Sequence, residues 1–162
     1  MNNKYKEIVD EIINNDSFNR LDDIVHHGGS RLDHVKKVSY YSYRISEKLR
    51  LDSSAVARAG LLHDYFLKPN YGVRRRTASF FTHPKQALEN SRKEFGLTKK
   101  EANIIKSHMF PLSIYIPRYR ESALVCIVDK VVASKDFIRS FRWRFVRKKA
   151  CTAIFLALWS KI

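Results

Sequence analysis

The chain has 162 residues, of which 44% are hydrophobic and 12% aromatic, and a formal net charge of +15. This length suits one domain with one core, and the apolar content excludes a disordered chain, because burial of that surface offsets the entropy lost on folding. The charge favours anionic partners, such as phosphate esters, nucleic acid or an acidic membrane surface, unless it only provides a soluble cationic surface.

A targeting segment and a membrane span are not expected. The first seven residues lack the apolar stretch of a signal peptide, and the apolar run 150–159 is too short to cross a bilayer. Cys126 and Cys151 form no motif and lie in apolar runs, so we expect buried free thiols, which fit a reducing compartment. These features predict a cytoplasmic protein.

The first half of the chain has the spacing of helices. Apolar residues recur at helical intervals over 4–14 and 32–50. Asp52 and Ser53 are candidate N-caps for a helix from about 54 to 65. The segment 66–82 holds a proline, a glycine and three consecutive arginines, which predict an exposed loop.

Start and stop signals also mark helices in the second half. The pair His83-Pro84 is expected to open a helix, since proline fits the first helical position, and Gly96 to end it. Thr98 and Glu101 form a capping box for the next helix.

The last part of the chain predicts two further helices, over 119–138 and 140–160, after a loop with two prolines at 110–118. No strong alternation typical of strands competes with these helices. The expected fold class is therefore all-α, a compact bundle of about six to seven helices.

A charged pair, His63-Asp64, follows the apolar run 59–62 at the end of its predicted helix. Such a pair is costly to bury unless it has a partner, and a metal ion is one such partner. The alternative is a core histidine that its neighbour orients. Asp129 lies inside the apolar run 125–132, so its carboxylate must be paired, protonated or bound to metal.

His34, then His63-Asp64, then Asp129 resemble the H…HD…D signature of the HD superfamily of metal-dependent phosphohydrolases. The resemblance covers roughly residues 20–138 and implies a single HD domain over 1–162, with 139–162 as a basic, aromatic C-terminal helix. It also implies that these four residues hold one metal ion. The chain shows no Gly-Tyr-Pro after the histidines, which argues against the cyclic-dinucleotide specificity of HD-GYP enzymes.

Two further histidines, His83 and His108, look like the extra pair of binuclear HD enzymes, in which Asp64 would bridge to a second metal. Alternatively, His83 is a helix cap and His108 a buried core residue. Imidazole and carboxylate ligands suit one or two divalent ions of iron, manganese, zinc, nickel or cobalt, and the lack of a cysteine ligand argues against a structural zinc site.

The resemblance implies hydrolysis of a phosphate ester or nucleotide through a metal-bound hydroxide, with His63, Asp64 and Lys130 as catalytic residues. No serine or cysteine lies in an evident triad. The alternative is a non-catalytic HD-fold module that binds a nucleotide or nucleic acid. We expect the partner to be an anionic phosphorylated small molecule or nucleotide, with nucleic acid as the second choice.

Basic residues near the predicted ligands are candidate phosphate contacts, because guanidinium and ammonium groups bind phosphate. Each arginine could instead belong to a solvated loop, and Lys130 is the leading candidate because it follows Asp129. The candidates for substrate binding are Lys130, Arg74, Arg75, Arg76 and Arg120.

The segment 137–149 mixes basic and aromatic residues. This composition fits contact with RNA or with an acidic membrane surface. A commoner arrangement is a helix that packs its aromatic side chains on the core and exposes its charges.

Overall fold

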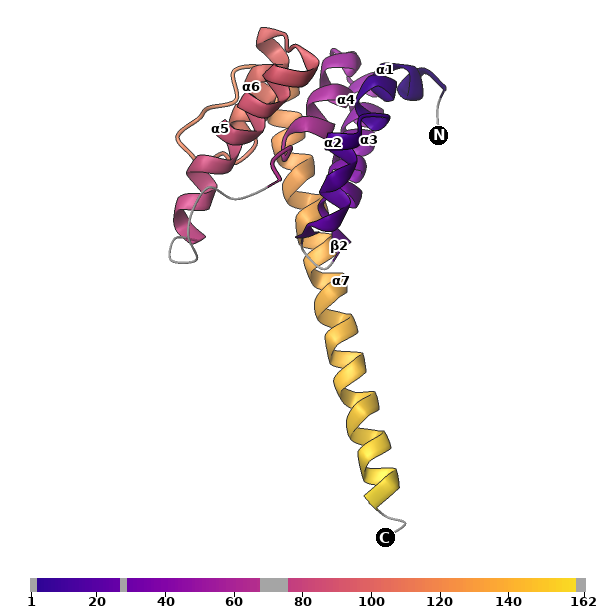
Figure 1. Cartoon of the computed structure of the whole chain (residues 1–162). Coiled ribbons are helices and arrows are strands. Elements are labelled where there is room, and N and C mark those ends of the chain that lie inside the picture. The colour runs from indigo at the N-terminus through magenta and orange to yellow at the C-terminus, as the bar shows by residue number, and fades with distance from the viewer. Residues whose placement is uncertain (1–2, 27–28, 68–75, 160–162) are drawn as a thin grey trace.

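The computed structural model describes residues 3–26, 29–67 and 76–159, and the side chains of these residues except 25–26, 76–81 and 142–159. The described residues form α-helices, one 3₁₀ helix and one short pair of strands, so the predicted all-α class is confirmed. The elements are α1 (Asn3–Ile13), α2 (Asp16–Asn19), η1 (Arg20–Asp23), β1 (Val25–His26), β2 (Gly29–Ser30), α3 (Arg31–Lys48), α4 (Ser53–Leu62), α5 (Arg76–Phe95), α6 (Lys99–Ser107) and α7 (Arg120–Trp159) (Figure 1).

The predicted caps fix the starts of two helices. The Asp52 side chain accepts a hydrogen bond from the backbone N–H of Ala55 and caps α4. Thr98 and Glu101 form the reciprocal capping box that begins α6. Ser30, which the sequence did not single out, caps α3 in the same way. Each cap satisfies a backbone donor that has no partner inside its own helix.

The prediction that His83-Pro84 opens a helix was wrong, because α5 begins at Arg76 and contains Pro84 in its interior. Residues 77–82 hold neither glycine nor proline, so nothing in the local sequence prevents the helix from starting at Arg76, upstream of Pro84. Gly96 follows the helix with a φ of 55°, as its predicted stop role requires. Residues 68–75 of the predicted loop lie outside the described residues.

The two helices predicted over 119–138 and 140–160 are one helix, α7. No glycine or proline occurs near residue 139, so the backbone has no reason to break there. The first half of α7 packs against α3 and α6, and its last turns extend beyond the other helices (Figure 1). In the part of the chain that the structure describes, no helix is both long and apolar enough to span a membrane.

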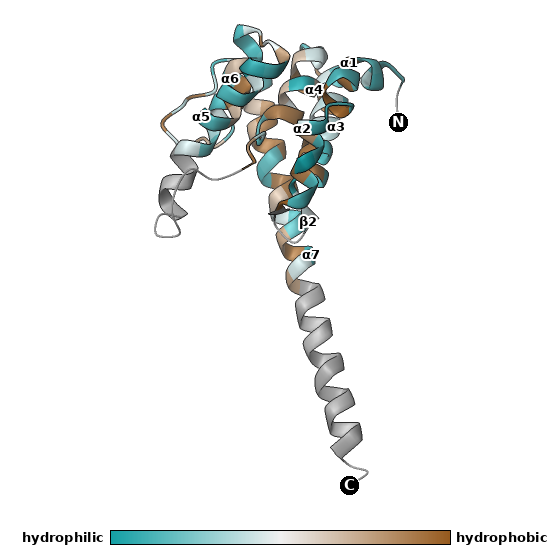
Figure 2. Ribbon diagram, viewed as in Figure 1, coloured by the Kyte–Doolittle hydropathy of each residue, from teal (hydrophilic) through white to brown (hydrophobic). Residues whose placement is uncertain are grey.

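The core lies where α3, α4, α6 and the first half of α7 meet. Figure 2 shows hydrophobic residues concentrated on α4 and on that half of α7, whereas the outer surfaces of α1, α5 and α6 are largely hydrophilic. Fully buried members include Val35, Leu62, Ile104 and Val125. Cys126 is buried with a free thiol, as predicted, while the Cys151 side chain is not among those described.

Helices α3 and α4 approach each other closely at Gly60. A Cβ atom at this position would lie 2.8 Å from the Ser39 Cα and 3.3 Å from its Cβ. The Ser39 hydroxyl donates to the Ala57 carbonyl at 2.7 Å and also bonds the Tyr5 hydroxyl at 2.8 Å. Only glycine fits this crossing without movement, and the crossing sets the distance between His34 on α3 and His63 at the end of α4.

Candidate metal centre

The first group of candidate ligands joins three elements. His34 comes from α3, His63 is the C-cap of α4, and Asp129 comes from α7. All three side chains are buried, and one candidate ligand atom from each lies within 4.8 Å of the others. The Asp129 Oδ1 atom is 3.0 Å from His34 Nε2 and 3.6 Å from His63 Nε2.

The second group consists of Asp64, His83 and His108, from the turn after α4, from α5 and from the C-cap of α6. His83 Nε2 and His108 Nε2 lie 3.0 Å apart, and each lies 3.6 Å from Asp64 Oδ1. All three side chains are buried.

The two groups adjoin each other. His63 and Asp64 are consecutive residues, and the ring centroids of His63 and His108 lie 5.0 Å apart. The structure therefore brings all six predicted ligands into one buried region, which no single helix could do. The residues that meet there are His34, His63, Asp64, His83, His108 and Asp129.

The spacing within each group fits a shared divalent ion. Two atoms bound to one ion at about 2.1 Å, with an angle of roughly 90–110° between them, lie about 3.0–3.4 Å apart. The measured separations of 3.0 and 3.6 Å are close to this range. The donor set, imidazole and carboxylate without thiolate, is also one that divalent transition metals accept.

Backbone carbonyls orient two of the histidine rings. The Gly60 carbonyl lies 2.8 Å from His63 Nδ1, and the Ile105 carbonyl lies 2.6 Å from His108 Nδ1. A neutral ring that donates from Nδ1 carries a lone pair on Nε2. Those lone pairs face the oxygens of Asp129 and Asp64. A lone pair facing a carboxylate is repulsive unless a proton or a metal ion lies between them.

His63 Nε2 is the atom that most clearly indicates a metal site. This atom is fully buried and makes no hydrogen bond among the described residues, because Asp129 Oδ1 lies 3.6 Å away, just beyond hydrogen-bond distance. A buried polar atom without a partner costs free energy, so such atoms are rare in native proteins. A metal ion between His63 and Asp129 removes that cost.

The electrostatics of the ion-free centre agree with this geometry. Burial alone would lower the pKa of His63, but the carboxylates of Asp129 and Asp64 outweigh it and raise this pKa to about 9. Burial would raise the pKa of Asp129, yet His34 and His63 hold it well below its ordinary value. Asp129 is therefore ionised, and its negative charge favours the protonated, positively charged form of His63.

The second group differs in its charge balance. Burial, reinforced by the nearby imidazoles of His63 and His83, lowers the pKa of His108 to about 3. His108 is therefore neutral at physiological pH, which is the state in which a histidine binds metal.

Lys130, predicted to contact substrate, lies against the backbone. Its ammonium donates to the His108 carbonyl at 2.8 Å and to the Cys126 carbonyl at 3.3 Å, and it lies 3.1 Å from the Cys126 sulfur. These contacts tie the end of α6 to α7, and so hold His108 near Asp129. Sequence reasoning placed Lys130 near the site, but adjacency alone could not show which groups its ammonium meets.

The predicted arginines are less fully described. Arg120 is exposed at the first residue of α7, nine residues or about 13 Å along the helix from Asp129. Arg74 and Arg75 lie outside the described residues, and Arg76 begins α5 with a side chain that is not among those described. A role for the arginines stays a prediction.

Asp136 is a site residue that the sequence reasoning missed. Its carboxylate lies 3.9 Å from His34 Nδ1 and accepts a hydrogen bond from Lys37 Nζ at 3.0 Å. Lys37 Nζ also pairs with Asp33 at 2.8 Å. The available signal was spacing, because Asp136 follows Asp129 by two helical turns and so shares its face of α7.

Arg31 was missed as well. Its guanidinium lies 3.8 Å from the centroid of the Phe66 ring and donates to the Phe66 carbonyl. The Phe66 ring in turn lies 5.4 Å from the His83 ring, centroid to centroid. A buried arginine thus packs Phe66 against a candidate ligand, an arrangement with no local signal in the sequence.

The model of the HD domain family matches residues 31–134, from the first residue of α3 to within α7. The chain belongs to the HD domain family. The matched range contains all six candidate ligands and agrees with the resemblance expected over roughly 20–138. HD domains form a superfamily of metal-dependent phosphohydrolases, and this member has two His/Asp groups positioned for metal. No curated protein and no solved structure matches the chain.

Proposed function

We propose that this HD-domain protein is a phosphohydrolase that cleaves a phosphate ester or nucleotide with the help of one or two divalent metal ions. One observation carries the proposal: two buried His/Asp groups adjoin each other, and in both a histidine Nε2 atom faces a carboxylate oxygen at 3.6 Å. That arrangement is costly for a structural core and suited to metal binding.

Different residues of the chain would bind each of the two ions. His34, His63 and Asp129 would hold one ion, and His83 and His108 a second, with Asp64 shared between the two. Divalent ions bound there supply a water ionised near neutral pH and positive charge for the phosphoryl oxygens. The Gly60 and Ile105 carbonyls, which orient the rings of His63 and His108, would keep those ligands in place.

Charge favours an anionic substrate. Asp64 and Asp129 are the two carboxylates of the set, so two divalent ions would leave the centre with positive charge. The surrounding chain carries a formal charge of +15. The basic run 74–76 leads directly into α5, the helix that carries His83, and is our proposed contact for the substrate phosphate.

Lys130 is assigned here to positioning. Its ammonium holds the carbonyl of His108, a proposed ligand, so its effect on turnover would come through that ligand. A direct contact with substrate would require the ammonium to leave the His108 and Cys126 carbonyls.

The alternative, an HD-fold module that binds a nucleotide or nucleic acid without turnover, predicts the same fold. The complete set of six candidate ligands argues against it, because a module without catalysis has no need to keep every ligand.

One assay distinguishes the phosphohydrolase from the binding module. The purified protein is incubated with manganese, cobalt, nickel, iron or zinc and with p-nitrophenyl phosphate, bis-p-nitrophenyl phosphate and a panel of nucleotides. We expect metal-dependent hydrolysis that Asp64→Asn abolishes and that Asp22→Asn, an exposed carboxylate on η1, leaves intact. If no substrate is cleaved with any metal while nucleotides bind tightly, the binding module replaces the enzyme.

A further inference from the structure

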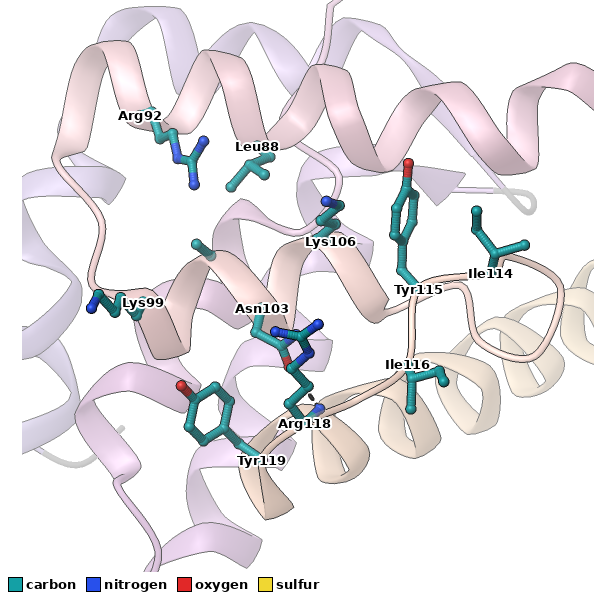
Figure 3. A pocket seen from close by; sticks show the side chains of 11 residues that line it. Leu88, Arg92, Lys99, Asn103, Lys106, Ile114, Tyr115, Ile116, Arg118 and Tyr119 are labelled. Carbon is teal, nitrogen blue, oxygen red and sulfur yellow. Dashed lines mark hydrogen bonds between the residues drawn. The ribbon is translucent and has the colours of Figure 1, made fainter.

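A cavity of about 500 Å³ lies between α5, α6 and the segment that joins α6 to α7 (Figure 3). Its size falls within the range of pockets that take organic ligands and exceeds what a single inorganic ion needs. Four cationic side chains line it: Arg92 from α5, Lys99 and Lys106 from α6, and Arg118 from the joining segment.

This cavity lies on the opposite side of α6 from the metal centre. Lys99, Asn103 and Lys106 follow one another at intervals of four and three residues, so they share one face of the helix. Ile105 and His108 are buried on the other face. A ligand in the cavity would therefore be separate from a substrate at the six candidate metal ligands.

The charge in the cavity has one sign. No acidic residue lines it, and none of its four cations is paired with a carboxylate in the part of the chain that the structure describes. Lysine and arginine side chains that line one cavity without counter-charges repel one another, and a polyanion relieves that repulsion. Phosphate groups fit this requirement, because guanidinium and ammonium groups both bind them.

The rest of the lining is aromatic and apolar. Tyr115 and Tyr119 contribute rings, and the Tyr115 ring lies 4.4 Å from Lys106 Nζ. Ile114 and Ile116, at the side of the cavity, are 78% and 64% exposed. A ligand with a flat, partly apolar portion would cover these residues and could stack on a tyrosine ring.

The cavity is also held in shape. The Asn103 side-chain oxygen accepts hydrogen bonds from the Arg118 backbone at 2.9 Å and from the Ser122 hydroxyl at 2.8 Å. These bonds fix the joining segment against α6 and α7. A preformed site loses little entropy when it binds a ligand.

We infer that this cavity binds a nucleoside di- or triphosphate, with its phosphates among the four cations and its base against the tyrosine rings. The inference is independent of hydrolysis at the metal centre and assigns a second site to the chain.

Equilibrium binding of a fluorescent, non-hydrolysable nucleoside triphosphate to the purified full-length chain tests the inference. The variant Arg92→Gln/Lys106→Gln removes two cavity charges and is expected to weaken binding at least tenfold. The matched control, Lys6→Gln/Lys48→Gln, removes two exposed charges from α1 and α3 and is expected to change affinity less than twofold. Equal weakening in both would show that only the overall charge attracts the nucleotide and would overturn the site.

A second pair of variants guards against local misfolding and against binding elsewhere. Arg118→Gln keeps the backbone bond to Asn103 and the contact of Lys106 with Tyr115, and should also weaken binding. Asp64→Asn, in the metal centre, should retain one bound nucleotide per chain, and circular dichroism reports whether each variant is folded. Complete loss of binding in folded Asp64→Asn would place the nucleotide at the metal centre and overturn the inference.

Three competitors test the chemical class. A nucleoside triphosphate should compete at least tenfold better than pyrophosphate, and Tyr115→Leu should reduce that difference. Equal competition by pyrophosphate would refute a role for the base. A single-stranded oligonucleotide that binds more than tenfold better than the nucleoside triphosphate would show that the cavity is part of a nucleic-acid surface, contrary to the inference.

Discussion

Gly60→Ala is the most informative single substitution, because it adds one methyl group where α3 and α4 cross. The new Cβ would lie 2.8 Å from the Ser39 Cα, whereas carbon atoms in ordinary contact lie about 3.5–4.0 Å apart, so the helices must separate by roughly 1 Å. Overpacking of this kind costs about 1–3 kcal/mol. Alanine recovers about 1 kcal/mol through its higher helix propensity, so we expect a net loss of up to about 2 kcal/mol.

The same movement should weaken the metal centre. His34 lies on the displaced helix and His63 follows Gly60 by one turn, so their separation changes with the crossing. Altered support of a metal ligand typically costs 10–100-fold in affinity, and we expect about tenfold for the group formed by His34, His63 and Asp129. Urea unfolding measures the first effect, and metal titration followed by mass spectrometry of bound metal measures the second.

Gly29→Ala is the matched control. A Cβ there would lie 3.9 Å from the nearest atom, Asp33 Oδ2, which is ordinary contact. Its unfolding free energy should therefore stay within about 0.5 kcal/mol of the parent, or rise slightly because alanine restricts the unfolded chain. The packing argument fails if Gly60→Ala is as stable as Gly29→Ala and binds metal as tightly.

Three further substitutions test separate parts of the structure. His83→Ala should lower the occupancy of the second metal and leave the first nearly full, and retention of two ions per chain would refute His83 as a ligand of the second metal. Lys130→Met should lower kcat more than it changes KM and leave the metal content intact, because it releases the His108 carbonyl that the ammonium holds. Lys130→Arg should restore part of kcat, and unchanged kcat in Lys130→Met would refute a positioning role. The third is Lys100→Met, which removes the cation shared by Asp52 and Glu121. The hydrogen bond from the Ala55 backbone, and after it Lys100, lower the pKa of Asp52. Burial would raise the pKa of Glu121, but backbone hydrogen bonds and Lys100 outweigh burial and lower this pKa as well. The two carboxylates therefore stabilise the fold at pH values above their unfolded pKa values of about 4. This stabilisation is lost as the pH falls through their lower pKa values in the folded state. Urea unfolding from pH 7 to pH 3 should show a smaller acid loss in Lys100→Met than in the parent, and identical curves would contradict the pairing.

Local signals in the sequence predicted the fold class and several helix ends correctly. Asp52, the Thr98–Glu101 box and Gly96 act within a few residues of the chain, so their effect is readable without tertiary information. The start of α5 was mispredicted because Pro84 marks a helix start only by preference. The unbroken α7 was mispredicted because no helix-breaking residue separates the two helices predicted over 119–138 and 140–160.

The candidate ligands depended on non-local information. His34 and Asp129 are 95 residues apart in sequence and 3.0 Å apart in space, a contact that spacing alone cannot predict. The resemblance to the HD superfamily supplied that pairing. Asp136, beside His34, carries no motif, and its spacing from Asp129 was the one signal in the sequence. Arg31 contacts the ligand His83 only through Phe66, and the packing of Arg31 on Phe66 alone reveals it.

The metal content of the full-length chain, purified without chelator and measured by mass spectrometry, tests the metal centre most directly. We predict one to two divalent transition metal ions per chain in the parent protein and loss of most of this metal in folded His63→Ala. A parent protein that holds no metal and takes up none from a metal-supplemented buffer, or a His63→Ala variant that retains the full amount, would contradict the account.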